Sequence, residues 1–228
     1  MIILTDLSEV LIRGITGTEK IVRDRYGKRV AKEYVQRRTG INPIFCELMR
    51  GHISEDVYWY VFLQNKSWPF NSSELKEILS LNMMKKIPGT LDVYQRIISY
   101  PDSTEMMAAQ IDGRPDFWLA SDHIFEREVE LEYLHPDVFK LVSNQLWSFD
   151  YSILKSDTGF FRRVLSRYDL LPEEVVFIDD YQPNIVAAAA EGITTIKFMD
   201  AEQLETELCR LGFLFADTVQ EANEINGF

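Results

Sequence analysis

Short runs of β-branched and other apolar residues divide the chain and predict its strands. They occupy residues 2–5, 117–120, 175–178 and 193–198. The runs are nearly continuous rather than alternating, which is typical of strands buried on both faces of a parallel sheet. The first three end abruptly at a polar residue, so each predicted strand has a clear carboxyl end.

Apolar residues at helical spacing predict helices between these strands. In the first part of the chain the predicted helices cover residues 18–39, 43–50, a segment opened by Ser54 as N-cap, and about 71–85. In the later part they cover residues 90–99, 156–168, 183–191 and 201–211. Residues 15–85 are therefore predicted to be helical throughout, whereas the remainder alternates strand and helix.

This order predicts an α/β fold, with a Rossmann-like parallel sheet as its core and an inserted all-α cap. The helical stretch is too long for a simple crossover between two strands, so we interpret it as a separate cap. The predicted core comprises residues 1–14 and 86–228, and the predicted cap comprises residues 15–85. A polar excursion over 100–116 and the tail at 213–228 receive no predicted function.

Composition and charge narrow the classes of function. The chain has 228 residues, of which 46% are hydrophobic, so it can bury a core. It carries 24 Lys and Arg against 36 Asp and Glu, a formal net charge of −12. An acidic surface repels phosphates at long range, which argues against nucleic acid or a membrane as partner. A phosphorylated substrate would need a local cation to overcome this field.

Cysteine usage and hydropathy point to a soluble, cytoplasmic protein. Cys46 and Cys209 form neither a disulfide framework nor a thiolate metal cluster. The first residues lack a basic leader, and no apolar run is long enough to predict a membrane span. The sequence has no pattern that sets an oligomeric state.

Polar residues follow three of the predicted strands. Asp6, Ser121 and the pair Asp179-Asp180 stand directly at the ends of their apolar runs. Taken singly, each is best interpreted as a loop or cap residue. Because parallel strands bring their carboxyl ends to one edge of a sheet, where ligands bind, together they predict one site.

The motifs around these residues resemble those of the haloacid dehalogenase (HAD) superfamily, in particular its members with a helical cap after the first strand. The resemblance covers about residues 1–200. It rests on Ile-Leu-Thr-Asp-Leu-Ser-Glu-Val-Leu at 3–11, Phe-Trp-Leu-Ala-Ser-Asp at 117–122, Lys155, and Val-Phe-Ile-Asp-Asp-Tyr-Gln-Pro-Asn at 176–184. Residues 49–56 are similar to a turn in the cap of this branch.

The resemblance implies a role for each matching residue. Asp6 would be the nucleophile and Lys155 would neutralise both Asp6 and phosphate. The implied phosphate-binding residues are Ser121, Asp122, Lys155 and Asn184, the last of which orients neighbouring groups in the family pattern. The implied cofactor is Mg²⁺, an ion that prefers oxygen ligands. Its implied ligands are Asp6, the backbone carbonyl of Ser8, Asp180 and, as a ligand or one layer behind, Asp179.

The sequence departs from the family pattern in three places. Phosphatases of this family carry a second Asp two residues after the nucleophile, and Ser8 stands there instead. A hydroxyl does not titrate near neutral pH, so Ser8 cannot serve as the proton donor; water, a substrate group or Glu9 are the candidate substitutes. Asp122 stands where Asn is common, and Ser156 follows Lys155 where Pro is usual.

These motifs lead to a hypothesis of Mg²⁺-dependent hydrolysis of a small phosphorylated metabolite, such as a sugar phosphate, through an aspartyl-phosphate intermediate. Two alternatives stay open: a non-catalytic protein that binds a phosphorylated ligand or a protein partner, and a 2-haloacid dehalogenase. Arg50 and His52, in the cap turn, and His123 are further candidates for substrate contact.

Overall fold

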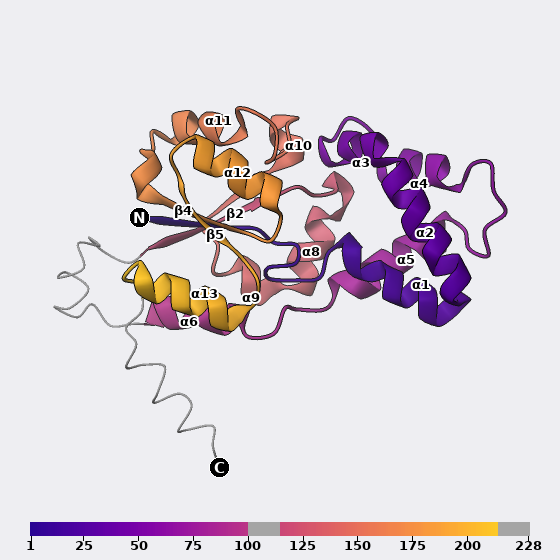
Figure 1. The fold of residues 1–228 in the computed structure, drawn as a ribbon, viewed down its shortest axis with the longest axis horizontal. Coiled ribbons are helices and arrows are strands. Elements are labelled where there is room, and N and C mark those ends of the chain that lie inside the picture. Colours follow the sequence, from indigo (N-terminus) through magenta and orange to yellow (C-terminus); the bar gives the residue numbers. More distant parts are fainter. Residues whose placement is uncertain (100–114, 214–228) are drawn as a thin grey trace, which may run out of the picture.

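The computed structural model of the chain describes residues 1–99 and 115–213 (Figure 1). The strands are β1 (Ile2–Thr5), β2 (Asp116–Ser121), β3 (Asn144–Trp147), β4 (Val175–Asp179) and β5 (Thr194–Lys197). All pairings are parallel, and the strand order is β3-β2-β1-β4-β5. The α/β prediction is therefore confirmed. The predicted excursion at 100–116 and the tail from 213 lie almost wholly outside the described residues.

Helices cover both faces of the sheet (Figure 1). One face is covered by α11 (Phe160–Tyr168) and α12 (Gln182–Ala190), and the other by α6 (Thr90–Ser99) and α13 (Ala201–Arg210). Because successive strand residues point to opposite faces, β1 places Ile3 in one apolar core and Leu4 in the other. Burial on both faces explains the continuous apolar runs of the sequence.

A block of helices between β1 and β2 lies beside the sheet (Figure 1). This helical block consists of η1 (Ile15–Gly17), α1 (Thr18–Tyr26), α2 (Lys28–Gly40), α3 (Asn42–Met49), α4 (Glu55–Leu63) and α5 (Ser72–Met83). The single helix predicted over 18–39 was wrong, because Gly27 separates α1 from α2 with φ +88°, a value that only glycine adopts readily. The domain bounds at 14/15 and 85/86 stay predictions.

The helical block is joined to the sheet at two places. The two connecting segments pair with each other, since Arg13 N–H donates to the Lys85 carbonyl and Ile87 N–H to that of Leu11, both at 2.8 Å. Farther along, the buried guanidinium of Arg127 donates to both oxygens of Glu55 on α4, at 2.6 and 2.8 Å. These contacts fix the block against the carboxyl edge of the sheet.

The segment between β2 and α11 is more regular than the sequence predicted. It contains η2 (Phe125–Arg127), α8 (Glu128–Leu134), α9 (Pro136–Phe139), β3 and α10 (Ser148–Tyr151), and a further short helix, η3 (Pro172–Glu174), follows α11. The prediction missed β3 because its sequence is Asn-Gln-Leu-Trp, and an edge strand with a partly exposed polar half has no continuous apolar run. Across the described residues, no helix combines the length and the apolar composition that crossing a bilayer requires.

Candidate active site

The register of the central strands brings Asp6 and Asp179 together. Thr5 on β1 is paired with Leu119 on β2 and with Ile178 on β4, so the residues that follow share one edge. The Asp6 N–H donates to the Ile178 carbonyl at 2.9 Å and extends this ladder by one residue. Asp6, 173 positions before Asp179 in the sequence, is thus fixed beside it by backbone hydrogen bonds.

Lys155 lies between these two carboxylates. Its Nζ is 2.7 Å from Asp6 Oδ1 and 2.7 Å from Asp179 Oδ2, and it donates to the Ala120 carbonyl at 3.0 Å. Two of its three donors make hydrogen bonds, to Asp179 and to Ala120, and Asp6 is held at the same ammonium as an ion pair. Lys155 therefore contributes positive charge at the edge of the cavity, and its contact with phosphate stays a prediction.

Burial and charge act in opposite directions on this ion pair. Burial alone lowers the pKa of Lys155, but the carboxylates of Asp179 and Asp6 outweigh it and hold that pKa above its ordinary value. Burial raises the pKa of Asp6 well above its ordinary range, and the Lys155 charge offsets part of the rise. The lysine is thus fully charged, and Asp6 depends on nearby positive charge to remain a carboxylate.

The two oxygens of Asp6 are held differently. Oδ1 is paired with the Lys155 ammonium and accepts a hydrogen bond from the Leu7 N–H at 2.7 Å. Among the described residues none donates a hydrogen bond to Oδ2, and Asp6 lines a cavity at the carboxyl edge of the sheet. One oxygen is therefore fixed by the protein while the other is available to a ligand.

Asp179 and Asp180 have different surroundings although they are adjacent. Asp179 is fully buried, and its oxygens accept from Lys155, from the Tyr181 N–H at 2.7 Å and from the Asn184 side chain at 3.0 Å. Asp180 is partly exposed and lines the cavity. The predicted role of Asn184 as a phosphate ligand stays a prediction, because in this structure its amide orients Asp179.

Three carboxylates form a cluster that suits a divalent cation. One carboxylate oxygen from each of Asp6, Asp179 and Asp180 lies within 4.8 Å of the others. With Lys155 beside them, these groups leave a local charge of two negatives when ionised, which one divalent ion balances. An all-oxygen donor set fits Mg²⁺ better than softer metals. Since Lys155, Tyr181 and Asn184 already use the oxygens of Asp179, that residue fits a place behind the ligands.

The turn after β1 determines the position of Ser8, which replaces the second Asp of the family pattern, and the position and hydrogen bonds of Glu9, which follows it. Glu9 has φ +62°, an uncommon value for a residue with a side chain, as the chain turns sharply here. Its Oε1 accepts from the Gly14 N–H at 2.9 Å and from the Thr16 hydroxyl at 2.5 Å, and its Oε2 accepts from Arg13 at 2.9 Å. Both Ser8 and Glu9 line the cavity, but the Glu9 carboxylate is engaged in holding this turn.

Ser121, the last residue of β2, and Asp122, which follows it, differ in their access to the cavity. The Ser121 hydroxyl is fully buried without a hydrogen-bond partner among the described residues, and it does not line the cavity. Asp122 does line it, and its Oδ1 accepts from the Lys155 N–H at 3.0 Å, which ties the two loops together. The predicted phosphate contact of Ser121 would therefore require a ligand to reach behind Asp122.

The protonation of Asp122 gives a testable dependence on pH. Burial raises its pKa to about 6, against an ordinary value of 3.8, with Lys155 lowering it again in part. The unfolded chain releases this proton at lower pH than the folded chain, so the contribution to stability falls as pH rises from about 4 through 6. We expect Asp122→Asn to raise the free energy of unfolding at neutral pH by roughly 1–3 kcal/mol.

Urea unfolding at pH values below 4 and above 7, with chelator present, measures this difference. The gain should vanish on the acid side, where Asp122 is neutral in both states. Asp137→Asn is the matched control, since it removes a carboxylate that pairs with the part-exposed Lys86 and should give no gain at neutral pH. A gain for Asp122→Asn that is the same at both pH values would contradict the assignment.

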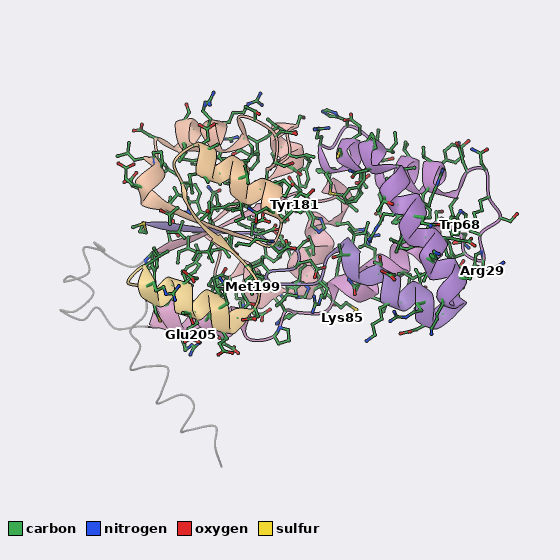
Figure 2. The ribbon with its side chains drawn as sticks, viewed as in Figure 1. Arg29, Trp68, Lys85, Tyr181, Met199 and Glu205 are labelled. Atoms are coloured by element: carbon green, nitrogen blue, oxygen red, sulfur yellow. The ribbon has the colours of Figure 1, made fainter. Side chains whose placement is uncertain are left out.

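The cavity lies between the carboxyl edge of the sheet and the helical block, and its volume is about 310 Å³. Tyr181, which lines it, lies between the two parts in Figure 2. The helical block contributes apolar side chains to its wall: Ile15, Phe45, Cys46, Met49, Leu79 and Met83. None of these residues was predicted to line the site, because an apolar position on a helix has the same hydropathy pattern whether it faces a core or a cavity.

Of the histidine and arginine candidates for substrate contact, His123 lines the cavity and the other two do not. His123 lines the cavity, and its Nδ1 accepts from the Ile124 N–H at 2.9 Å, which leaves the ring proton on Nε2. Arg50 and His52 do not line it. Arg50 pairs with Asp157 at 2.8 Å and so joins the helical block to the loop before α11, whereas His52 pairs with Glu47 within the block.

The fold of this chain is similar to that of several solved structures. No protein-family model matches the chain, and no curated protein matches it by sequence. Solved structures do match. A HAD family enzyme from Bacteroides thetaiotaomicron, in complex with magnesium and inorganic phosphate, has a TM-score of 0.59 and 17% identity, over 87% of this chain and 93% of its own.

Two further structures are similar. A predicted HAD-like family hydrolase from Porphyromonas gingivalis has a TM-score of 0.62 and 17% identity, over 92% of this chain and 96% of its own. The L-2-haloacid dehalogenase from Xanthobacter autotrophicus, with chloropropionic acid covalently bound, has a TM-score of 0.55 and 13% identity, over 92% and 83%. These likenesses, together with the strand order and the paired Asp6 and Lys155, show that the chain has the fold of the haloacid dehalogenase superfamily.

Proposed function

We propose that this chain is a Mg²⁺-dependent hydrolase that cleaves a small phosphate monoester by attack of Asp6. The observation that carries the proposal is the position of Asp6 at the carboxyl edge of the sheet, 2.7 Å from the buried Lys155 ammonium, with a second oxygen available to a ligand in the cavity. A carboxylate held in this way can act as a nucleophile.

The residues that would hold Mg²⁺ are Asp6, Asp180 and the backbone carbonyl of Ser8, with Asp179 behind them. When bound, the ion supplies positive charge between the Asp6 carboxylate and an anionic ester. The neighbour from Bacteroides thetaiotaomicron, solved with magnesium and inorganic phosphate, supports this part of the proposal at the level of the shared fold.

The proposed reaction has two displacements on phosphorus. Asp6 Oδ2 attacks, an O–P bond forms, the ester P–O bond breaks, and the leaving alcohol takes up a proton. Water then attacks the phosphorus of the aspartyl phosphate and loses a proton, the bond between Asp6 Oδ2 and phosphorus breaks, and inorganic phosphate leaves with the Asp6 carboxylate restored. Lys155 holds Asp6 oriented throughout and keeps Asp179 paired.

Among the described residues, the turn after Asp6 offers no side chain that is free to protonate the leaving alcohol by general acid catalysis, so proton transfer is expected to limit turnover. Ser8 cannot supply the proton, and Glu9 accepts from Arg13, Gly14 and Thr16 in the turn. General acid help is worth about 10²–10⁴-fold in rate, so we expect turnover to be slow for alkyl esters and faster for esters whose leaving oxygen needs no proton. Solvent water and a group on the substrate remain as donors.

A panel of phosphate monoesters assayed for phosphate release, with Mg²⁺ and with chelator, tests the proposal. We expect turnover with Mg²⁺, its loss with chelator, and a melting temperature that rises on addition of Mg²⁺ alone. Turnover that is insensitive to chelator would refute the metal-dependent mechanism.

A non-catalytic binding protein is the second candidate, favoured by Ser8 and by the engagement of Glu9. It predicts that Mg²⁺ and a phosphate ester raise the melting temperature together while no ester is hydrolysed. Such a result across the whole panel would replace the hydrolase proposal.

The dehalogenase alternative has less support. A halide leaves without a proton, which suits Ser8, and one similar structure is a 2-haloacid dehalogenase. The carboxylate of a 2-haloacid, however, would meet Asp180, Asp122 and Glu9 in a cavity lined by no arginine among the described residues. Halide release from 2-haloacids without metal would support this alternative.

A further inference from the structure

Much of the cavity wall is apolar. Ile15, Phe45, Met49 and Met83 contribute carbon or sulfur atoms from the helical block, and Ile124 and Leu154 contribute them from the sheet side. A volume of about 310 Å³ is at the small end of ligand pockets. The part of a substrate that lies beyond its phosphate would therefore be compact and would contact mostly apolar side chains.

The charged groups of the cavity are unfavourable to a second anion. Asp6, Glu9, Asp122 and Asp180 line it, whereas Lys155 is the one cationic side chain among its described lining residues. The Lys155 ammonium already donates to Asp179 and Ala120 and is paired with Asp6, so protein oxygens balance its charge. A carboxylate or a second phosphate on the ligand would thus be desolvated beside acidic groups without a partner, which is costly.

Some of the uncharged polar groups that line the cavity already have partners within the protein. The Thr16 hydroxyl donates to Glu9, and the Asn184 amide donates to Asp179. The side chains of Ser8, Asn42, Ser156 and Tyr181 and the Nε2 of His123 are left to meet polar atoms of a ligand. A polyol would bury several hydroxyls against apolar side chains, and each unpaired hydroxyl weakens binding.

We infer that the substrate is a phosphate monoester of a compact, uncharged and largely apolar alcohol, rather than a sugar phosphate or an ester with a second acidic group. This inference rests on the proposed function, and it replaces the sugar phosphate that the sequence analysis suggested. The apolar wall provides attraction for such an alcohol, and the acidic lining excludes competitors that carry another negative charge.

Three esters of primary alcohols test the inference, because their leaving oxygens are chemically alike. They are benzyl phosphate, para-carboxybenzyl phosphate and the terminal phosphate ester of ribose. We expect kcat/KM for benzyl phosphate to exceed that of either competitor by about tenfold or more. A preference for ribose phosphate or for the carboxylated ester would overturn the inference and leave the proposed function intact.

A charge introduced into the apolar wall should shift this preference. Cys46→Lys places an ammonium in the wall, and we expect it to raise kcat/KM for para-carboxybenzyl phosphate relative to benzyl phosphate by about tenfold. Cys46→Met, of similar length but neutral, should keep the wild-type ratio. Because Cys46 is partly buried, Asn42→Lys at the exposed start of α3 is a second variant, paired with Asn42→Met. An unchanged ratio in folded lysine variants would contradict the inference.

Binding of non-hydrolysable phosphonates separates this inference from the proposed function. With Mg²⁺ present, benzylphosphonate should raise the melting temperature more than para-carboxybenzylphosphonate does. If it does so while no ester is turned over, the hydrolase proposal fails and the ligand class stands. If neither turnover nor this difference in melting temperature is found, both proposals fail.

Discussion

Asp6→Asn is expected to reduce kcat for phosphate ester hydrolysis by about 10⁴-fold or more, because an amide cannot form the acyl phosphate. The change is nearly isosteric, and the new Oδ1 can still accept from the Leu7 N–H, as Asp6 does at 2.7 Å. It also removes a buried charge, so the melting temperature should stay the same or rise. Phosphate release under saturating Mg²⁺ measures the loss.

The control for this variant is Asp137→Asn, which removes a part-exposed carboxylate on α9, outside the cluster at the sheet edge. It should retain wild-type kcat. In the wild-type protein, mass spectrometry after acid quenching should find a phosphoryl group on the peptide that contains Asp6. Undiminished hydrolysis by Asp6→Asn, or a phosphoryl group on a different residue, would exclude Asp6 as nucleophile.

Lys155→Met is expected to lower the free energy of unfolding by about 3–5 kcal/mol, the usual cost of removing one partner from a buried ion pair. The methionine side chain fills similar space but leaves the buried carboxylates of Asp6 and Asp179 facing each other without a cation. Chemical unfolding in the presence of chelator measures the loss. Lys86→Met, at a part-exposed pair with Asp137, should cost no more than about 1 kcal/mol.

Two further measurements distinguish charge from packing in this variant. The destabilisation should shrink as pH falls, since protonation of the unpaired carboxylates removes their repulsion. Added Mg²⁺ should recover more stability in Lys155→Met than in the wild-type protein, because the ion then supplies the missing positive charge. A loss that is independent of both pH and Mg²⁺ would mean that Lys155 contributes through packing alone.

The sheet could be predicted wherever a strand is buried on both faces. The strands β1, β2 and β4 follow from continuous apolar runs, since burial between two helix layers excludes polar residues. The edge strand β5 has the sequence Thr-Thr-Ile-Lys, and its β-branched residues are what predicted it. The edge strand β3 could not be predicted, because its partly exposed Asn144 and Gln145 interrupt the run. Gly27 is a similar case, since its φ of +88° rather than any change in hydropathy separates α1 from α2.

The candidate site was predictable to the extent that it depends on strand ends. Asp6, Ser121 and Asp179 follow apolar runs, and parallel pairing brings such residues to one edge whatever their distance along the chain. Lys155 came from the resemblance alone, since nothing in its local sequence distinguishes it from a surface lysine. Its burial between Asp6 and Asp179 became visible only once the loop before α11 was folded onto the sheet.

The hydrophobic pattern along the chain is sufficient to specify the strands buried on both faces and the acidic residues that meet at their ends, because burial and parallel pairing depend on that pattern. What those residues do for one another follows from the packing of the folded chain. The turn at Glu9 directs its carboxylate to Arg13, Gly14 and Thr16, and the seating of the helical block turns Phe45 and Met49 toward the cavity. Side-chain direction depends on backbone angles and on packing between distant segments, and neither is encoded in local hydropathy.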